Sequence, residues 1–299
     1  MVKRTLYFGN PAYLKTKTEQ LVIEKQDDGE IVSVPVEDVG LVILDHAQIT
    51  ITSGLMAKLL EKNVALISCD NTHHPTGLML NLDGHTLQSR QFAAQIESSL
   101  PLKKQLWQQT ITAKIYNQAT LLKQVNKENK FLLNLAKDVK SGDSENHEAK
   151  AAGHYWKNLF PPFVGNFRRD RYGMPPNNML NYGYAILRAV VARSLVGSGL
   201  LPTLGIFHRN QYNAYCLADD IMEPYRPFVD KLVYTLLDPL EPVFELTTKI
   251  KKQLLTIPAM DVFINGERSP LMIGVQRTTA SLAKCFEGKA KSIVYAELE

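Results

Sequence analysis

The sequence has few of the features that mark a secreted, disulfide-bonded or membrane protein. Its 299 residues include only three cysteines, Cys69, Cys216 and Cys285, which lie far apart and form no Cys-x-x-Cys pair. Such spacing excludes a disulfide framework and disfavours a cysteine-based zinc site. No apolar run approaches the roughly 18 residues of a membrane-spanning helix, and the start of the chain lacks the apolar core of a signal peptide. We therefore expect a cytoplasmic protein with reduced thiols and no membrane partner.

Motifs that bind nucleotides or catalytic zinc are absent too. No glycine-rich P-loop occurs, and His147-Glu148 has no second histidine at the spacing of the zinc-protease motif His-Glu-x-x-His. The net charge of +4 is small, so it permits a nucleic-acid partner without requiring one. With 45% hydrophobic and 21% charged residues, the chain has the composition of a globular protein that can bury a sizeable core.

The first part of the chain has the patterns of β-strands. Two β-rich runs flank Asp28-Gly29, which is a strong hairpin signal. Residues 40–45 (GLVILD) and 64–70 (VALISCD) are short apolar runs, which are typical of buried strands. These patterns predict a small N-terminal β domain over residues 1–80.

One short helix and a hinge are predicted within and after this domain. Residues 53–63 (SGLMAKLLEKN) have the leucine spacing of a helix, and Thr52 or Ser53 is the expected N-cap. Turn-forming residues then crowd residues 71–86, which predicts a hinge or linker there.

Beyond the hinge, the hydrophobic residues recur with the helical period of 3.6, and the first long helical pattern is broken at Pro101. Another long helix should begin after Pro175-Pro176, with Asn177 or Asn178 as its N-cap. The overall prediction is an α+β fold. A small N-terminal β domain with one short helix precedes a larger all-α C-terminal catalytic domain, residues 87–299.

Three acidic residues, Asp219, Asp220 and Glu223, crowd a segment that has the pattern of a half-buried helix. Neighbouring carboxylates repel each other, and burial makes their ionisation costlier. A positive group should therefore lie opposite them, and either a metal ion or basic side chains of the chain itself would serve. The basic candidates nearby are Arg209, Arg226 and Lys231.

Two other residues could join these acids around one metal ion. Glu148 lies on a predicted helix among alanines, which leave room for another element to approach, and His208 precedes a polar, loop-like stretch. Alone, such a glutamate is more often solvated and such a histidine more often structural. His208 and Glu223 can share a site only if the loop from His208 folds back beside the helix. One imidazole and two carboxylates suit Mg²⁺ or Mn²⁺ and leave positions open for phosphate oxygens.

The sequence resembles the CRISPR-associated endonuclease-integrase of spacer acquisition, over nearly its whole length and in order. The stretch LADDIMEPYRPFVD, residues 217–230, is most similar to the subtype that accompanies a single large RNA-guided effector nuclease, in type II systems. The segments that carry the resemblance are LYFGNPAYL (6–14), PVEDVGLVILD (35–45), ITSGLMAKLLEKNVALISCD (51–70), HEAKAAGHYW (147–156), NNMLNYGYAILRA (177–189) and LPTLGIFHRNQYNAYCLADDIMEPYRP (201–227).

The resemblance implies a site and a reaction. It makes Glu148, His208 and Glu223 the catalytic ligands of one Mg²⁺ or Mn²⁺, and Asp220 a supporting residue that is not itself a ligand. Some family members have an aspartate at the position of Glu223. The implied reaction inserts short foreign DNA into a CRISPR repeat array: a 3′-hydroxyl of the DNA attacks a phosphodiester at the repeat boundary. Such a transesterification needs no nucleotide, which agrees with the missing P-loop.

The resemblance also implies partners. Family members form homodimers, and two such dimers flank a dimer of a small ferredoxin-like companion protein. The complex holds double-stranded DNA, first as the prespacer and then as the CRISPR repeat. The type II effector nuclease is a further candidate partner.

A basic loop offers candidate DNA contacts. Arg168, Arg169 and Arg171 lie between the predicted Glu148 helix and the next helix, and arginines can grip phosphates without reading sequence. The alternative is a solvated loop held by Asp170. Two other functions stay open from the residues alone, a DNA-binding scaffold without chemistry and a metallohydrolase of another phosphoester. The set of Glu148, His208 and Glu223 disfavours the scaffold, because a scaffold needs only basic residues.

Overall fold

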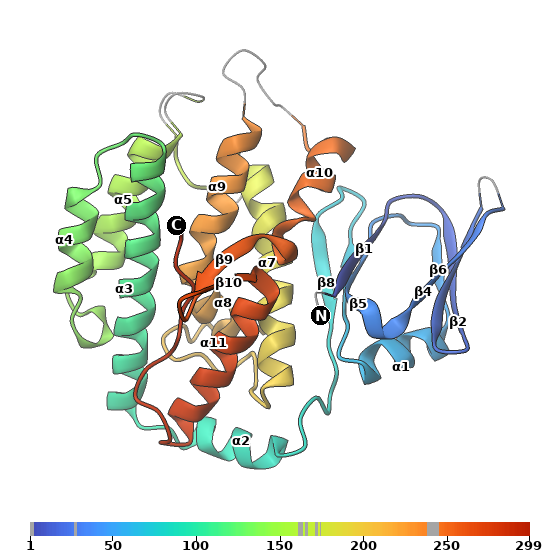
Figure 1. The fold of residues 1–299 in the computed structure, drawn as a ribbon, viewed down its shortest axis with the longest axis horizontal. Coiled ribbons are helices and arrows are strands. Elements are labelled where there is room, and N and C mark those ends of the chain that lie inside the picture. Colours follow the sequence, from blue (N-terminus) through green and yellow to red (C-terminus); the bar gives the residue numbers. More distant parts are fainter. Residues whose placement is uncertain are drawn as a thin grey trace.

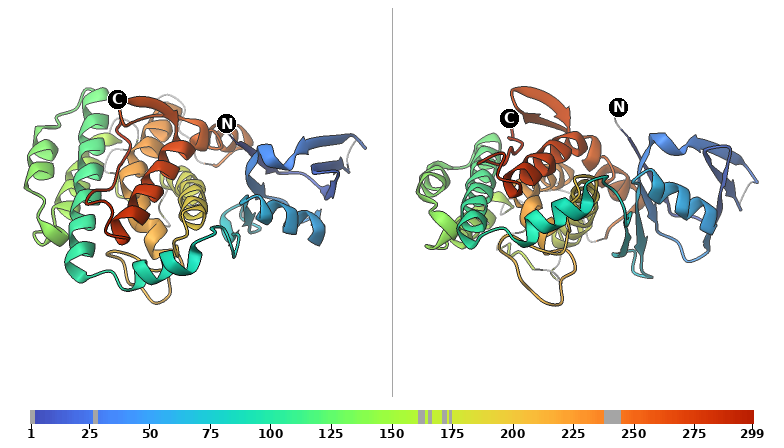
Figure 2. Two further views of the ribbon diagram at one scale, coloured as in Figure 1. Left: turned by 60° about the horizontal axis from the view of Figure 1, so that its bottom comes forward. Right: turned by 90° about the horizontal axis from the view of Figure 1, so that it is seen from below.

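The computed structural model describes residues 3–26, 29–160, 164, 167–170, 173, 175–237 and 245–299. The strands of the N-terminal part gather at one end of the molecule, and the rest is mostly helical, as Figure 1 and both views of Figure 2 show. The predicted α+β class is confirmed. The elements of the N-terminal part are β1 (Arg4–Phe8), β2 (Ala12–Lys17), β3 (Gln20–Lys25), β4 (Ile31–Pro35), β5 (Val39–Leu44), β6 (Ile49–Ile51), α1 (Ser53–Glu61), β7 (Ala65–Cys69) and β8 (Pro75–Met79).

The strands form two sheets of four, in the orders β1-β5-β7-β8 and β4-β3-β2-β6. In the first sheet, β1, β5 and β7 run parallel and β8 is antiparallel to β7. In the second, β3 pairs antiparallel with β2 and with β4. The hairpin predicted around Asp28-Gly29 joins β3 to β4; Gly29 has φ +69°, which suits glycine, and Asp28 lies outside the described residues.

The apolar runs of β5 and β7 are explained by burial on both faces of their sheet. Leu41 and Ile43 belong to the core shared with the helices, whereas Val42, between them, packs in the core beneath α1. Side chains alternate along a strand, so a strand covered on both faces must be apolar throughout. The N-terminal sheet is thereby joined to the helical part by a continuous core.

Helix α1 starts as predicted. Thr52, one of the two N-caps expected, accepts a hydrogen bond at its Oγ1 from the backbone N–H of Leu55 (3.3 Å). The hinge predicted at residues 71–86 needs correcting, because its middle forms β8 and pairs with β7. Residues 80–87 connect this strand to the first helix of the larger part.

The helical part is built around two long helices (Figure 1). α7 is almost wholly buried and packs against α8, α9 and α11, while α3 packs against α4 and α5. Pro101 lies in the first turn of α3, where its missing N–H costs nothing, so the predicted break is a helix start. The elements are α2 (Gln88–Ile96), α3 (Leu100–Gln124), α4 (Lys130–Asp138), α5 (His147–Leu159), α7 (Asn177–Gly197), α8 (Cys216–Met222), α9 (Arg226–Leu236), α10 (Thr248–Leu254), β9 (Asp261–Ile264), β10 (Glu267–Pro270) and α11 (Leu271–Phe286).

Two local predictions for this part need revision. α7 begins at Asn177, and neither Asn177 nor Asn178 is its N-cap; Pro176 holds that position without a side-chain cap. The part predicted as all-α also contains the antiparallel hairpin of β9 and β10. Its turn is Asn265-Gly266, both with positive φ, so a clear hairpin signal was present in the sequence. No helix within the described residues is both long and apolar enough to cross a membrane.

Candidate active site

Glu148 is placed by the first turn of α5. Asp143 precedes this helix and accepts hydrogen bonds from the backbone N–H of His147 (2.8 Å) and of Glu148 (3.0 Å). A carboxylate in this position satisfies N–H groups that the helix itself leaves unpaired and favours the positive end of the helix dipole. The backbone that carries Glu148 is therefore held firmly at its start.

Glu223 is placed by the junction of α8 with a single 3-10 turn, Glu223–Tyr225. Pro224 lacks the backbone N–H that an α-helix would use there, which explains why the backbone changes at this point. The side chain of Asn117, on α3, donates a hydrogen bond to the carbonyl oxygen of Pro224 (2.8 Å). α3 thus fixes the backbone next to Glu223.

His208 is brought to the acids because its loop folds back onto α8. Asp220 accepts hydrogen bonds from the backbone N–H groups of Ile206 (2.7 Å), Phe207 (3.0 Å) and His208 (3.2 Å). Its Oδ1 also lies 2.5 Å from Nδ1 of His208, and this contact raises the pKa of the imidazole. Because Nδ1 is engaged, Nε2 is the nitrogen left to bind a ligand.

Gly205 makes this approach possible. A Cβ atom there would lie 2.4 Å from the carbonyl oxygen of His208 and 2.7 Å from Oδ2 of Asp220, both far inside van der Waals contact. Only glycine lets the loop close onto Asp220. The fold-back on which the shared-site hypothesis depended is therefore present.

A lysine that the sequence analysis did not consider joins the two glutamates. Nζ of Lys114, on α3, lies 2.6 Å from Oε1 of Glu148 and 2.6 Å from Oε2 of Glu223. The side chains of Lys114 and Glu223 are 9% and 7% exposed. Burial acts to lower the pKa of Lys114, but the charges of Glu223 and Glu148 outweigh it and the pKa is raised. Lys114 is therefore a buried ammonium held between two carboxylates.

Arg226 completes the surroundings of Glu223. Its Nε donates to Oε1 of Glu223 (2.7 Å). Burial acts to raise the pKa of Glu223, but Arg226 and Lys114 outweigh it and lower the pKa to about 2. Oε2 of Glu223 is fully buried and, despite its short contact with Lys114, has no partner in hydrogen-bond geometry among the described residues.

Each crowded acid thus has its own partner. Asp219 pairs with Arg188 on α7 (2.7 Å), Asp220 with His208, and Glu223 with Lys114 and Arg226. Of the three basic side chains proposed from the sequence, Arg226 makes one of these contacts. Lys114 was missed, although a signal existed. It lies on the face of α3 that also carries Ile111, Asn117 and Leu121, all buried, and a lysine on a buried face needs an anion.

As they stand, the described residues contain no group of three His, Cys, Asp or Glu side chains close enough together to hold a metal ion. The ammonium of Lys114 takes the central position. The chemistry of the donors nevertheless suits a divalent cation, because Glu148 and Glu223 converge on one positive charge and Nε2 of His208 is not the nitrogen that contacts Asp220. The metal assignment of Glu148, His208 and Glu223 stays a prediction.

A second buried hydrogen-bond network joins α5, α7 and α9. Tyr155 on α5 and Tyr184 on α7 donate hydrogen bonds to Asp230 on α9, at 2.8 Å and 2.5 Å. Burial raises the pKa of Asp230 to about 7. The guanidinium of Arg226 lies over the ring of Tyr184, 4.5 Å from its centre, so this network reaches the partner of Glu223.

The arginine loop is described in part. Arg169 donates to the side-chain oxygens of Asn177 (3.0 Å) and Asn181 (2.6 Å), and its guanidinium lies 5.3 Å from the centre of the Tyr184 ring. These contacts favour a structural role for Arg169. Arg168 is exposed, and Arg171 lies outside the described residues. DNA binding by this loop stays a prediction.

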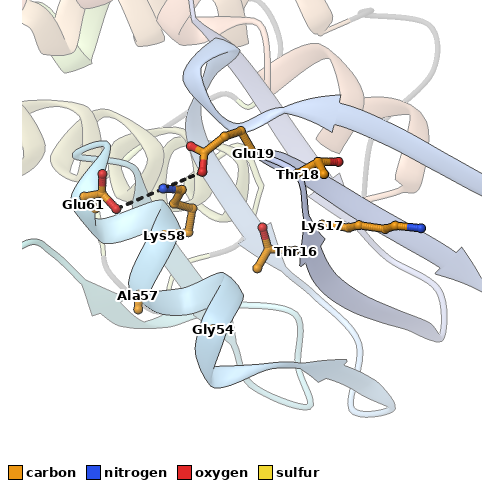
Figure 3. A pocket seen from close by; sticks show the side chains of 8 residues that line it. All are labelled: Thr16, Lys17, Thr18, Glu19, Gly54, Ala57, Lys58 and Glu61. Atoms are coloured by element: carbon orange, nitrogen blue, oxygen red, sulfur yellow. Dashed lines mark hydrogen bonds and ion pairs between the residues drawn. The ribbon is translucent and has the colours of Figure 1, made fainter.

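A surface hollow lies in the N-terminal part (Figure 3), and its lining residues do not include Glu148, His208 or Glu223. It is bounded by the end of β2, the turn that follows it and α1, and Lys58 pairs there with Glu19 (2.8 Å) and Glu61 (3.3 Å). Its lining side chains include no histidine, cysteine or buried acid, so it lacks the groups that the implied chemistry requires.

Comparison with known proteins identifies the family of this chain. The family model of the CRISPR associated protein Cas1 matches residues 6–241. The chain belongs to the Cas1 family. It is 35% identical to a CRISPR-associated endonuclease Cas1 of Neisseria meningitidis serogroup C (strain 8013) over 301 aligned positions, which cover 100% of this chain and 97% of that protein.

Solved structures share the fold of this Cas1 chain. A casposase bound to integration product superposes with a TM-score of 0.79 at 20% identity, covering 98% of this chain and 92% of that one. A Cas6-RT-Cas1–Cas2 complex superposes with a TM-score of 0.77 at 20% identity, covering 100% of this chain and 37% of that one. At such identity these likenesses show that the Cas1 fold extends over the whole chain.

Proposed function

We propose that this Cas1-family protein is a metal-dependent DNA integrase and endonuclease that inserts short foreign DNA into a CRISPR repeat array. The observation that carries the proposal is the convergence of Glu148 and Glu223, from separate helices, on a single buried positive charge, with the imidazole of His208 held by Asp220 on the helix that precedes Glu223. Burying two like charges side by side is costly and is maintained where a site needs them.

The residues divide the work as follows. Glu148, Glu223 and Nε2 of His208 hold one Mg²⁺ or Mn²⁺, which when bound stabilises negative charge on the attacking and leaving oxygens of a phosphodiester. Asp220 fixes the orientation of the imidazole through Nδ1 and anchors the loop through three backbone N–H groups. Arg226 keeps Glu223 ionised, so that it binds as a carboxylate.

The reaction is a transesterification. The 3′-oxygen of the incoming DNA loses its proton and forms a bond to phosphorus, while the bond from phosphorus to the 3′-oxygen of the repeat strand breaks and that oxygen gains a proton. One phosphodiester replaces another, so no nucleotide is consumed. With water as the attacking group, the same site hydrolyses DNA, which agrees with the endonuclease name of the Neisseria relative.

The names of solved neighbours support the proposed partners. One neighbouring structure is named as a Cas6-RT-Cas1–Cas2 complex, and another as a casposase bound to integration product. We infer a Cas1 homodimer that works with a small companion protein, two integrase dimers flanking one companion dimer. The substrates are double-stranded prespacer and repeat DNA, in the cytoplasm, and the type II effector nuclease is a further candidate partner.

Strand joining by single variants tests the proposal. Glu148→Gln, His208→Ala and Glu223→Gln should each lose at least about a hundredfold in joining of labelled duplex to a repeat-bearing plasmid at saturating Mn²⁺. Binding of the duplex, measured without divalent metal, should change little, because phosphate contacts come from elsewhere. Glu145→Gln is the matched control, since Glu145 lies just before α5 but pairs with Lys140 at the surface.

The same assay separates the rival functions. Wild-type joining rates from a folded Glu223→Gln protein, checked by circular dichroism, would remove the metal-ligand assignment and favour a DNA-binding scaffold. If the protein hydrolyses a small phosphoester and added DNA does not slow that hydrolysis, the result would favour the metallohydrolase.

A further inference from the structure

The position of Lys114 coincides with the position that a metal ion would need. Carboxylate oxygens bind Mg²⁺ at about 2.0–2.1 Å and larger divalent cations at up to about 2.6 Å. Nζ of Lys114 lies 2.6 Å from one oxygen of Glu148 and 2.6 Å from one oxygen of Glu223. An ion bound by both oxygens would fall within contact of Nζ, and two cations cannot share that space.

Lys114 also balances the charge of the site without metal. The two glutamates are matched by Lys114 and Arg226, so the charges of these four buried or part-buried groups sum to zero. A divalent ion added to them leaves two excess positive charges at a site of low exposure. Such an excess is unfavourable alone and attracts a phosphate group.

We propose that Lys114 is an internal counter-ion that occupies the cation position in the metal-free protein and is displaced when the divalent ion binds. This inference rests on the metal-dependent function proposed above. Displacement requires only the side chain to move, because the lysine stem is flexible while α3 stays packed. Lys114 therefore holds the two glutamates together without metal and lowers the affinity of the site for metal.

The proposal makes metal and DNA binding cooperative. Once displaced, the ammonium needs a new anionic partner, and the phosphate of a bound duplex supplies one. DNA should therefore raise the affinity for metal, and metal should raise the affinity for DNA by the same factor. Without Lys114, this coupling should be weaker, because metal binding then releases no ammonium toward the phosphate.

Binding of Mn²⁺ alone, measured by titration calorimetry, tests the displacement. Lys114→Met should bind Mn²⁺ about tenfold or more tightly than the wild type, a factor within the usual range for two linked events. A lysine that only holds the site together would give the opposite sign, since its loss would loosen the ligands. Lys114→Arg keeps the charge and is the matched control; its affinity should not exceed that of the wild type.

The outcomes are distinct. Equal or weaker Mn²⁺ binding by folded Lys114→Met overturns the inference and leaves the proposed function standing. Absence of Mn²⁺ binding by both wild type and variant overturns the metal-dependent function as well. If Lys114→Met does not fold without metal, Lys114→Gln takes its place with the same expectation, because its amide can still donate to the glutamates.

Addition of a short duplex tests the coupling between metal and DNA. It should raise the Mn²⁺ affinity of the wild type more than that of the variant; an equal gain counts against the coupling.

Discussion

Two lysines of this chain each lie between two glutamates, one at the surface and one in the interior. Lys58 pairs with Glu19 and Glu61 in the N-terminal part, where both glutamates are more than half exposed (Figure 3). Lys114 makes the equivalent pair of contacts with Glu148 and Glu223, at a site where the lysine is 9% exposed. The chemical groups are the same and the surroundings differ.

The two groups differ in the free energy that it costs to keep their charges in place. Water screens the charges of Lys58, Glu19 and Glu61 at the surface, so breaking these ion pairs costs little. The interior trio loses most of its hydration and is held by the charges of its members and of Arg226, so removing Lys114 leaves carboxylate charge uncompensated. The helices around Lys114 bury several charges, and a further buried pair, Asp45 with Lys251, joins the end of β5 to α10. Water is thus largely excluded from several ion pairs of this chain, whereas the pairs of Lys58 stay exposed to it.

The largest expected effect is the difference in stability between a variant that lacks Lys114 and one that lacks Lys58. Lys114→Ala should lower the free energy of unfolding by about 3–5 kcal/mol in the absence of metal, as expected when one partner of a buried ion pair is removed. Lys58→Ala should leave the denaturation midpoint almost unchanged. Urea unfolding of both variants measures this. Similar losses at the two positions would mean that burial does not decide the strength of these contacts.

The next largest expected effect is a change of stability with pH that is caused by Asp230. The pKa of Asp230 is about 7 in the folded protein, against an ordinary 3.8. Between about pH 4 and pH 7 the unfolded chain releases this proton while the folded chain keeps it, so the free energy of unfolding should fall as the pH rises. At about 1.4 kcal/mol per pKa unit, the fall is at most about 4 kcal/mol.

Asp230→Asn isolates this contribution, because asparagine does not titrate. Unfolding by urea at several pH values should give a flatter profile for the variant over that window. Asp138→Asn, at an exposed position, should keep the wild-type profile. A variant profile as steep as that of the wild type would assign the pH dependence to other groups.

The smallest effect is expected in the arginine loop, where an exposed and an engaged arginine can be compared for their part in DNA binding. Arg168 is exposed, whereas Arg169 is engaged with Asn177, Asn181 and the ring of Tyr184. Arg168→Ala should reduce the slope of log affinity against log salt by about 0.9 for duplex DNA, the value for one lost phosphate contact. Arg169→Ala should mainly lower stability. A salt slope unchanged by Arg168→Ala would leave this loop without a role in DNA binding.

The sequence by itself determined those features that depend on neighbouring residues. The apolar runs of β5 and β7, the turn at Gly29, the cap at Thr52 and the helix start at Pro101 all follow from local period and backbone preference. The hairpin at Asn265-Gly266 belongs to this class as well, and its strands of four residues each were too short to stand out. The resemblance then pointed to Glu148, His208 and Glu223 together.

Only the tertiary structure decided what lies opposite the crowded acids. Local patterns carry no information on which distant helix a buried side chain will meet, and Lys114 and Glu148 are 34 positions apart. The pairing arises because α3 packs against α5 and against the turn that carries Glu223. Burial then requires that each carboxylate be matched, and Lys114 is the cation that this packing supplies.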